Sequence, residues 1–327
     1  MGAAIVGTGA YVPNHVVSND DLVRIHGVDT SDEWIVSHTG IRARRWASAD
    51  QATSDLAHEA ARRALDDAGA TPADVALVIC ATSSPDYPIP ATANLVQHRL
   101  GIQAGGFDIN GVCSGFVQAL VTGFALCEQL ASGLVLVIGA DTYSRLIDLR
   151  DRRTAVFFGD GAGAVVLAPR AGSSWLQGSS HGCNGAAFDR IIVPMGGSRT
   201  TTTAAGIDAG EHKLRMDGRS VWEFATQRVP AAVRDVAARS GLSVTDLDLL
   251  IPHQANLRML EHCARELEMP RSKLVTNVER YGNTAAASIP IALHEARVEG
   301  KLGSGHRVAL VAFGSGLSWC AACLRWG

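Results

Sequence analysis

The sequence has no long apolar run, no excess of charge of one sign and no low-complexity segment. Its 29 basic and 32 acidic residues give a net charge of -3, so no global field favours nucleic acid or an anionic membrane. The N-terminal run MGAAIVGTGAYVP carries no basic residue and is too short for a signal peptide or a membrane span. We therefore expect no nucleic-acid or membrane partner, and we interpret this run as a first strand.

Cysteine is sparse and does not occur in zinc-type pairs. The count is seven, an odd number, in a chain far larger than disulfide-stapled scaffolds. This usage fits a reducing cytoplasm, where we place the protein, and we expect no metal site. The spacing Cys320-x-x-Cys323 occurs in redox motifs, but here it follows an apolar run instead of opening a helix. We interpret both cysteines as buried small hydrophobes.

Hydrophobic residues make up 47% of the chain and charged residues 19%, which is typical of a globular protein. The length of 327 residues allows one large domain or two of about 150 residues each. Short runs rich in Val, Ile and Leu alternate with amphipathic stretches, which predicts an α/β protein whose strands are covered on both faces. We predict a helix over 54–69 with Ser54 as its N-cap. The predicted strands are 75–80, 134–138, 164–168, 248–251 and 308–312.

A faint internal repeat runs through the chain. The pattern of ADVALVICATSS at 73–84 returns in TDLDLLIPHQAN at 245–256. GVCSGFVQAL at 111–120 returns in NTAAASIPIA at 283–292, and both copies are displaced by 172 residues. The chain therefore consists of two similar parts, each about half of its length.

The repeat predicts two duplicated α/β halves with corresponding loops on either side of a pseudo-dyad. The N-terminal half covers 1–172 and carries Cys113. The C-terminal half covers 173–327 and carries His253 and Asn283. All three residues fall on loops of the repeated set, so we expect the chemistry there.

The three loop residues are of types that perform chemistry. Cys113 follows a tight glycine turn and lies where a helix begins, so the positive end of the helix dipole favours its thiolate. His253 directly follows an apolar strand and would leave the sheet edge toward a crevice lined by loops. Asn283 follows a glycine and precedes a helix of small residues. Each residue alone is more often structural, and only the combination of the three indicates catalysis.

Six motifs occur in order over essentially the whole chain. They are SDEWIVSHTGIRARR (31–45), CSGF (113–116), FGDGAGAVVL (158–167), HQANLRML (253–260), YGNTAAASIP (281–290) and FGSGLSW (313–319). Together they resemble the motifs of the β-ketoacyl-acyl-carrier-protein synthase III enzymes of the thiolase superfamily. The resemblance implies a thiolase-like fold of duplicated α/β halves, with mixed sheets sandwiched between helix layers. It also implies that Cys113 is the nucleophile and that His253 and Asn283 complete the site.

The implied reaction is acyl transfer followed by decarboxylative carbon-carbon bond formation, in fatty-acid or polyketide-type biosynthesis. An acyl-CoA loads Cys113, whose thioester stays reactive toward carbon where a serine ester would be a poorer electrophile. The amides of Cys113 and, by motif position, Ser315 would form the oxyanion hole. A malonyl thioester on an acyl carrier protein then loses carbon dioxide, and His253 and Asn283 donate hydrogen bonds to the enolate oxygen. The substrates are the thioesters, and no further cofactor is expected.

The resemblance also implies residues that bind the thioester carrier. Trp34, Arg152 and Arg258 occupy positions that surround the nucleotide end of CoA or the phosphopantetheine of the carrier protein, where a ring stacks and guanidinium groups meet phosphates. Trp34 has the alternative interpretation of a core residue at a helix edge. His38 stands where the family usually has arginine, and imidazole gives less dependable positive charge. The preference for CoA or carrier protein therefore stays open.

An acyl pocket follows from the same motif positions. It would include Tyr143, Phe158 and Trp222, with Ile89 reaching in from the second subunit of a homodimer. The two large rings favour a short or a flat acyl group. The identity of that group does not follow from the sequence.

Other functions fit the residues less well. Gly111-x-Cys113-x-Gly115 mimics a nucleophile elbow, but no papain-type motif is present and no aspartate is marked as a triad partner. The glycine motifs lack the third glycine of a dinucleotide fingerprint and the lysine of a phosphate-binding loop. A ketosynthase-like acyltransferase that moves the acyl group to a hydroxyl or an amine stays open as an alternative. Asn283 argues against it, because an enolate needs that donor.

Overall fold

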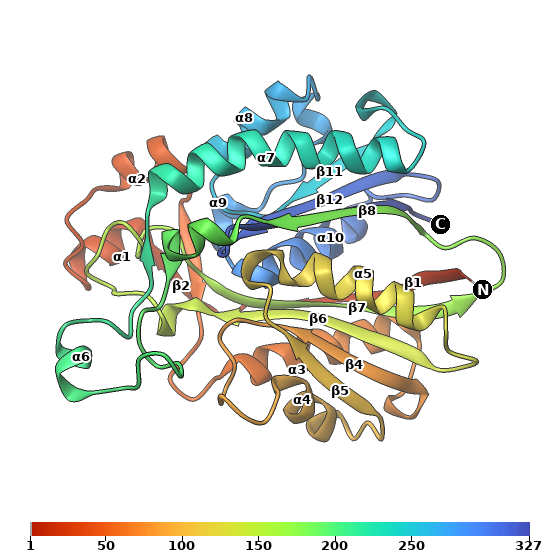
Figure 1. The fold of residues 1–327 in the computed structure, drawn as a ribbon, viewed down its shortest axis with the longest axis horizontal. Helices are drawn as coiled ribbons and strands as arrows, with labels where there is room; N and C mark the ends of the chain where they lie inside the picture. Colours follow the sequence, from red (N-terminus) through yellow and green to blue (C-terminus); the bar gives the residue numbers. More distant parts are fainter. Residues whose placement is uncertain (1) are drawn as a thin grey trace.

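The computed structural model describes residues 2–327, and its strands form two mixed sheets (Figure 1). The first sheet has the strand order β1-β7-β6-β4-β5, and the second has the order β11-β12-β13-β8. The strands of the first sheet are β1 (Gly2–Tyr11), β4 (Val75–Ala81), β5 (Gly105–Ile109), β6 (Leu134–Thr142) and β7 (Asp160–Arg170). Those of the second sheet are β8 (Leu176–Cys183), β11 (Leu249–Pro252), β12 (Arg307–Gly314) and β13 (Ser318–Arg325). Two small ribbons pair β2 (His15–Ser18) with β3 (Ala43–Trp46), and β9 (Ile191–Ile192) with β10 (Arg215–Met216).

Helices form three layers around the two sheets (Figure 1). Helices α3 and α4 cover the first sheet, α5 and α10 lie between the sheets, and α7 and α8 cover the far side of the second. This arrangement confirms the predicted fold, in which mixed sheets are sandwiched between helix layers. Within residues 2–327, no helix is long and apolar enough to cross a membrane. The helices are α1 (Asn19–Arg24), α2 (Asp32–Thr39), α3 (Thr53–Ala68), α4 (Thr92–Leu100), α5 (Gly115–Cys127), α6 (Ala204–Asp208), α7 (Gly218–Arg239), α8 (Leu257–Glu266), α9 (Val278–Tyr281) and α10 (Ser288–Val298).

Helix α3 confirms the predicted helix but begins earlier than expected. Its apolar stripe, which includes Leu56 and Ala60, is fully buried against the first sheet. The N-cap is Ala52, and the prediction of Ser54 as the cap is wrong. The Ser54 amide and hydroxyl both donate to the Asp86 carboxylate, at 2.8 and 2.7 Å. The Ser54 side chain therefore binds Asp86, which is distant in sequence, and does not cap the helix as the local sequence predicts.

Both sheets pack against the two middle helices, so α5 is apolar on nearly all sides and α10 is fully buried over 288–293, before its polar residues His294, Glu295 and Arg297. Phe116 and Phe124 of α5 share one buried cluster with Ile289 of α10. A helix without a polar face is stable only inside a core. These two helices therefore fix the turns that precede them, which carry Cys113 and Asn283.

The second sheet repeats the pairing pattern of the first. In the first sheet, β1/β7 and β7/β6 are antiparallel, and β6/β4 and β4/β5 are parallel. In the second, β8/β13 and β13/β12 are antiparallel, β12/β11 is parallel, and a parallel bridge joins Leu250 to Leu274. The first sheet ends at Arg170 and the second begins at Leu176. The division of the chain at residue 172 stays a prediction, which this repetition supports.

The five predicted strands are present as β4, β6, β7, β11 and β12, which confirms them. Cys320 and Cys323 both lie on β13 and are buried. They point to opposite faces, because Cys320 packs between the sheets and Cys323 packs in the cluster that includes α7. Their interpretation as buried hydrophobes is confirmed.

Candidate active site

Cys113 lies on a tight elbow between β5 and α5. Val112, just before it, has a φ of 49°, in the left-handed region that is costly for a β-branched residue. The elbow is a 3-10 turn, Val112–Ser114, which α5 continues. Gly314 of β12 packs directly against this turn, because a Cβ atom at Gly314 would lie 3.0 Å from the Cys113 Cβ atom. The prediction that Cys113 lies where a helix begins is confirmed.

The Cys113 side chain is buried, with 8% of the residue exposed. Burial raises the pKa of its thiol well above the ordinary value, and the charge of Asp141 acts in the same direction. Burial therefore opposes the dipole of α5, which favours the thiolate. The expectation that the helix favours the thiolate of Cys113 stays a prediction.

His253 follows β11 and is held at three points. Its backbone amide donates to the carbonyl of Val311 at 2.8 Å. Its ring edge meets Phe313 with centroids 5.3 Å apart, and its Nδ1 atom lies 2.7 Å from the Ser288 hydroxyl. Burial lowers the pKa of His253 to about 3. The ring is therefore fixed and uncharged near neutral pH.

Asn283 lies at the start of the turn that leads to α10. Its backbone amide donates to the Phe157 carbonyl at 2.8 Å, and its own carbonyl accepts from the Gly159 amide at 3.0 Å. The side-chain oxygen Oδ1 accepts from the Ala285 amide at 2.9 Å. That bond assigns the two ends of the Asn283 amide and leaves the Nδ2 donors to face the pocket.

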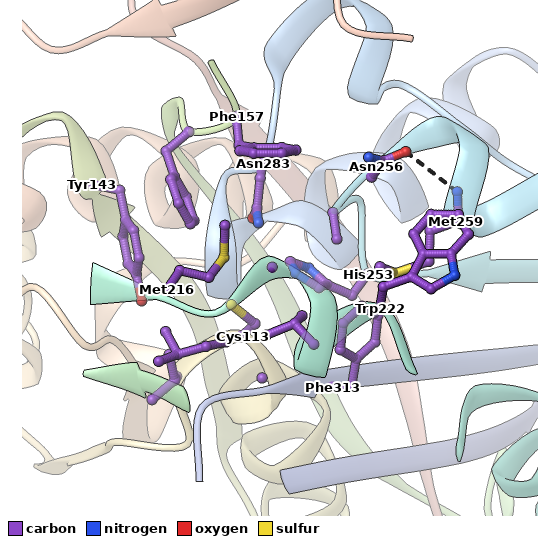
Figure 2. Close-up of a pocket in the computed structure, with 17 residues that line it drawn as sticks. Cys113, Tyr143, Phe157, Met216, Trp222, His253, Asn256, Met259, Asn283 and Phe313 are labelled. Atoms are coloured by element: carbon purple, nitrogen blue, oxygen red, sulfur yellow. Dashed lines mark hydrogen bonds between the residues drawn. The ribbon is translucent and has the colours of Figure 1, made fainter. Parts of the chain in front are cut away.

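One apolar pocket contains all three predicted catalytic residues, and Figure 2 shows Cys113, His253 and Asn283 turned toward the same space. The pocket volume is about 90 Å³. An apolar cavity of about 150 Å³ holds benzene, so this pocket suits a smaller group. The predicted Tyr143, Phe158 and Trp222 also line it, together with Val112, Phe157, Ile191, Met216, Gly218, Val221, Ala255, Asn256, Met259, Phe313 and Gly314.

Tyr143 separates this pocket from a second cavity of about 260 Å³. Tyr143, Val112 and Ile191 line both cavities and form the wall between them. The Tyr143 ring stacks on Phe158 with centroids 4.9 Å apart, and its hydroxyl is 2.9 Å from the Ser83 hydroxyl. Stacking and hydrogen bonding fix the ring, so Tyr143 closes one end of the pocket.

A buried carboxylate, Asp141, joins loops from the two sheets. Its Oδ1 atom accepts from the amides of Ser83 and Ser84 at 2.9 and 3.1 Å, and its Oδ2 atom accepts from the Ala286 amide at 2.9 Å. Burial raises the pKa of this carboxyl, and the amide donors oppose that rise. Asp141 thus ties the Asn283 turn to the end of β6. Our sequence reasoning missed it, although an acid directly after an apolar strand was a signal.

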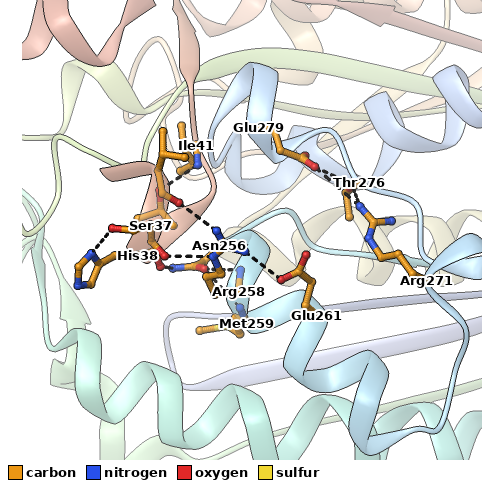
Figure 3. A network of polar contacts seen from close by, with 12 residues as sticks. Ser37, His38, Ile41, Asn256, Arg258, Met259, Glu261, Arg271, Thr276 and Glu279 are labelled. Atoms are coloured by element: carbon orange, nitrogen blue, oxygen red, sulfur yellow. Dashed lines mark hydrogen bonds and ion pairs between the residues drawn. The ribbon is translucent and has the colours of Figure 1, made fainter. Parts of the chain in front are cut away.

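Helix α2 carries Trp34, which does not line the pocket and packs against His38 and Arg152. The Trp34 and His38 rings stack with centroids 4.3 Å apart, and the Arg152 guanidinium lies 4.9 Å from the Trp34 ring centroid. Asn256, which lines the pocket, donates to the His38 carbonyl at 3.3 Å and so fixes the end of α2 against α8 (Figure 3). The structure brings Trp34 and Arg152 together with His38. Trp34 also packs on the core, so both of its interpretations find support.

Arg258 joins α8 to α2 through its guanidinium group. Its Nε atom donates to the Ser37 carbonyl at 3.1 Å and Nη2 to the Val36 carbonyl at 3.4 Å. Its Nη1 atom pairs with Glu261 at 3.3 Å (Figure 3). The protein itself therefore engages the donors that we assigned to a phosphate, and the binding role of Arg258 stays a prediction.

Ser315 and Ile89 lie outside the lining of the pocket. Ser315 lines the second cavity, and its hydroxyl donates to the Ile191 carbonyl at 2.6 Å, which holds the β12–β13 turn in place. Its neighbour Gly314 contacts the Cys113 turn. Ile89 is 85% exposed, so it does not line the pocket of its own chain. Its role across a dimer stays a prediction.

Comparisons with known proteins agree with this geometry. Residues 237–326 match the family profile "3-Oxoacyl-[acyl-carrier-protein (ACP)] synthase III C terminal", and residues 107–185 match "3-Oxoacyl-[acyl-carrier-protein (ACP)] synthase III". A beta-ketoacyl-[acyl-carrier-protein] synthase III from Symbiobacterium thermophilum is 44% identical over 327 residues, covering 99% of this chain and 98% of the relative. An acetoacetyl CoA synthase from a Streptomyces species is 46% identical over 326 residues, covering 98% of each chain. The crystal structure of 3-oxoacyl-[acyl-carrier-protein] synthase III from Aquifex aeolicus has a TM-score of 0.90 at 39% identity, covering 99% of this chain and 100% of that one.

Proposed function

The chain belongs to the 3-oxoacyl-[acyl-carrier-protein] synthase III family, and from that membership we propose a role for each residue of the pocket. It is a condensing acyltransferase, which joins an acyl group from acyl-CoA to a malonyl thioester with loss of carbon dioxide. In our proposal Cys113 carries the acyl group, and His253 and Asn283 donate hydrogen bonds to the enolate.

In the first half-reaction the Cys113 sulfur attacks the carbonyl carbon of the acyl-CoA. The bond from that carbon to the CoA sulfur breaks, a thioester forms on Cys113, and the thiol proton leaves with CoA, which departs as a thiol. The amides of Cys113 and Ser315 would stabilise the negative oxygen of the tetrahedral intermediate. The close packing of Gly314 on the Cys113 turn supports this pairing, because it brings the next amide toward the same space.

In the second half-reaction a malonyl thioester loses carbon dioxide, and the electron pair of the broken bond forms an enolate. The enolate oxygen accepts hydrogen bonds from Asn283 and His253. The enolate carbon then attacks the Cys113 thioester, a carbon-carbon bond forms, the bond to sulfur breaks, and the sulfur takes a proton from solvent. Neutral donors serve here because neither must lose a proton, and burial lowers the pKa of His253 to about 3.

We propose that the acyl group is short. The pocket volume is about 90 Å³, and its walls are almost entirely apolar. Tyr143 closes the end of the pocket and is itself fixed by Phe158 and Ser83. A longer chain would have to displace a buried ring whose hydroxyl is hydrogen-bonded, which costs both packing and that bond.

The thioester carrier would bind beside α2. Trp34 offers a ring face and Arg152 a cation next to it, which suits the base and phosphates of CoA. His38 adds a second ring, stacked on Trp34. We propose that the extender arrives on an acyl carrier protein, because the names of two relatives describe a β-ketoacyl group on that carrier. The name of the acetoacetyl CoA synthase relative makes malonyl-CoA the alternative to test.

A homodimer is proposed from the free edge of the first sheet. Strand β5 pairs with β4 on one side and has no partner strand among residues 2–327 on the other. Phe107 on that edge is 36% exposed, and the nearby Tyr87 and Ile89 are 57% and 85% exposed. An exposed apolar edge strand favours pairing with a second copy. Sedimentation should show a dimer that Ile89→Asp weakens, and a monomer at all concentrations would contradict this.

We also propose a cytoplasmic location. The cysteines, all of which lie within residues 2–327, are free in the structure. Free thiols persist in a reducing compartment. Localisation of the tagged protein in fractionated cells would test this.

The convergence of Cys113, His253 and Asn283 on one apolar pocket is the observation that carries the proposed function. The test is incubation with acetyl-CoA followed by a malonyl thioester on CoA or on a carrier protein. We expect an acyl adduct in the intact protein mass, then carbon dioxide and a β-ketoacyl thioester. An adduct that passes to a hydroxyl or an amine without carbon dioxide would instead support a plain acyltransferase.

A further inference from the structure

Ser288 holds the His253 ring from the side away from the pocket. Ser288 opens α10, and its Oγ atom lies 2.7 Å from Nδ1 of His253. Both residues are only 1% exposed. The reaction steps above do not use this hydroxyl, although it is the direct partner of a proposed catalytic ring.

The second partner of the Ser288 hydroxyl determines which atom is the donor in its hydrogen bond with His253. The backbone amide of Gln254 donates to Ser288 Oγ at 3.4 Å. Within residues 2–327, His253 Nδ1 is the one acceptor recorded for the hydroxyl proton. A hydroxyl that accepts from an amide directs its own proton to the remaining acceptor. The reverse arrangement would leave a buried hydroxyl proton without a partner, which is unfavourable.

The direction of this bond fixes the tautomer of the ring. A neutral imidazole carries one proton, so Nδ1 as acceptor places that proton on Nε2. Nε2 is the nitrogen that remains for the pocket, which His253 lines. The contacts with Val311 and Phe313 hold the ring in this orientation. His253 therefore presents a hydrogen-bond donor to the pocket and not a lone pair.

We propose that Ser288 is a positioning residue that holds His253 in the Nε2–H tautomer. His253 is thereby committed to donating to the enolate oxygen, and it is not the base that removes the Cys113 proton. This inference rests on the proposed function of His253 as an enolate donor. It predicts that loss of the Ser288 hydroxyl harms decarboxylation far more than acyl loading.

The kinetic test compares Ser288→Ala with Ser288→Thr, which keeps a hydroxyl. Acyl loading is followed by intact mass, and carbon dioxide release is followed in a single turnover of the loaded enzyme. We expect Ser288→Ala to lower the rate of carbon dioxide release by about tenfold to a hundredfold, with a much smaller effect on loading, and Ser288→Thr to restore most of it. An equal fall in both half-reactions, or no fall in carbon dioxide release, would overturn the proposal.

A spectroscopic test needs no functional variant. In protein labelled with [15N]histidine, protonated and unprotonated ring nitrogens have well-separated chemical shifts, and His253→Gln identifies the signals of this ring. We expect a proton on Nε2 of His253 in the wild type, and a mixture of tautomers in Ser288→Ala. A proton on Nδ1 in the wild type would overturn the proposal even if Ser288→Ala failed to fold.

A matched control is available in Ser180, a buried serine of β8 that does not line the pocket. Ser180→Ala should change neither half-reaction nor the His253 signals. This control distinguishes the effect of Ser288 on His253 from a general effect of losing a buried hydroxyl. The wild type itself tests the underlying function. If it neither loads an acyl group nor releases carbon dioxide, the proposed function fails, whereas the tautomer of His253 is still decided by the spectrum.

Discussion

The turn before α5 and the turn before α10 share one local design and perform different tasks. Each is a 3-10 turn whose first residue has a positive φ, 49° at Val112 and 47° at Ala285. Each leads into a helix between the two sheets whose first turns are buried. The first turn presents the sulfur of Cys113, and the second follows the amide of Asn283.

The two turns differ in the contacts that their functional groups make on the side away from the pocket. Cys113 is a buried thiol, packed against Gly314, that in our proposal changes covalently during the reaction. Asn283 and His253 have partners on the side away from the substrate, an amide for Oδ1 and the Ser288 hydroxyl for Nδ1. In our proposal one predicted half thus supplies the group that reacts, and the other supplies hydrogen-bond donors that are fixed before the reaction begins.

The largest expected effect separates the reacting group from all other thiols. Cys113→Ala should abolish the acyl adduct, because no other thiol lines the pocket. The matched control is Cys183→Ala, which removes an exposed free cysteine and should leave the adduct intact. Intact-protein mass after incubation with acetyl-CoA measures both variants. An adduct that survives in Cys113→Ala would contradict the proposal that Cys113 is the reacting group.

The next effect tests whether Tyr143, at the end of the pocket that holds Cys113, limits the length of the acyl group. Tyr143→Ala should join the pocket of about 90 Å³ to the cavity of about 260 Å³. A buried methylene contributes about 0.8 kcal/mol, so four more methylenes would shift the preference for hexanoyl-CoA over acetyl-CoA by on the order of a hundredfold. Tyr143→Phe keeps the ring and should keep the short preference. Ratios of kcat/KM for loading measure this, and an unchanged ratio in Tyr143→Ala would refute the role of the wall.

A smaller effect concerns the charge state of the His253 ring and its consequence for stability. Burial lowers the pKa of His253 to about 3, and the unfolded chain has an ordinary value of about 6.5. Between these values the unfolded state binds the extra proton, so His253 makes the protein less stable as the pH falls through this window, by at most about 1.4 kcal/mol per pH unit. Urea unfolding at several pH values should show a shallower acid loss in His253→Gln than in the wild type. Parallel curves would contradict the buried, neutral ring.

The smallest effect compares the two strained residues directly. The left-handed conformation costs a residue with a Cβ about 1 to 2 kcal/mol, and glycine costs about 0.5 to 1 kcal/mol in chain entropy. Loss of the fully buried Ala285 methyl group costs about 0.8 kcal/mol, so Ala285→Gly should change the free energy of unfolding by less than about 1 kcal/mol. Val112→Gly should destabilise the protein more, because it removes a larger side chain that lines the pocket. Denaturant unfolding measures both, and destabilisation by Ala285→Gly of more than about 1 kcal/mol would show that the turn is not strained.

The sequence predicted the strands well, because they depend on local signals, whereas the three candidate catalytic positions were found from motifs that lie far apart in the chain. The strands are short apolar runs, and the repeat placed Cys113, His253 and Asn283 on corresponding loops. The structure confirms that all three line one pocket, with Tyr143 and Phe158. Their catalytic roles are still a proposal.

The features that escaped prediction depend on contacts between distant segments. Ser54 does not cap α3 because Asp86 binds it, and Arg258 is engaged by the end of α2. Ser288 and Asp141 gain their roles only when α10 and the turn before it meet the ends of β11 and β6. The opposing effect of burial on the pKa of Cys113 also escaped prediction, because the helix dipole is visible in a sequence and the depth of burial is not.

The central claim is that Cys113 holds the acyl group while His253 and Asn283 act only on the enolate. The most direct measurement follows both half-reactions in His253→Ala and Asn283→Ala, by intact mass for loading and by carbon dioxide release from a malonyl thioester. We predict near-normal loading, with release lowered about 10² to 10³-fold, equivalent to about 2.7 to 4 kcal/mol. Equal loss of loading and release in both variants would contradict the claim and favour simple acyl transfer.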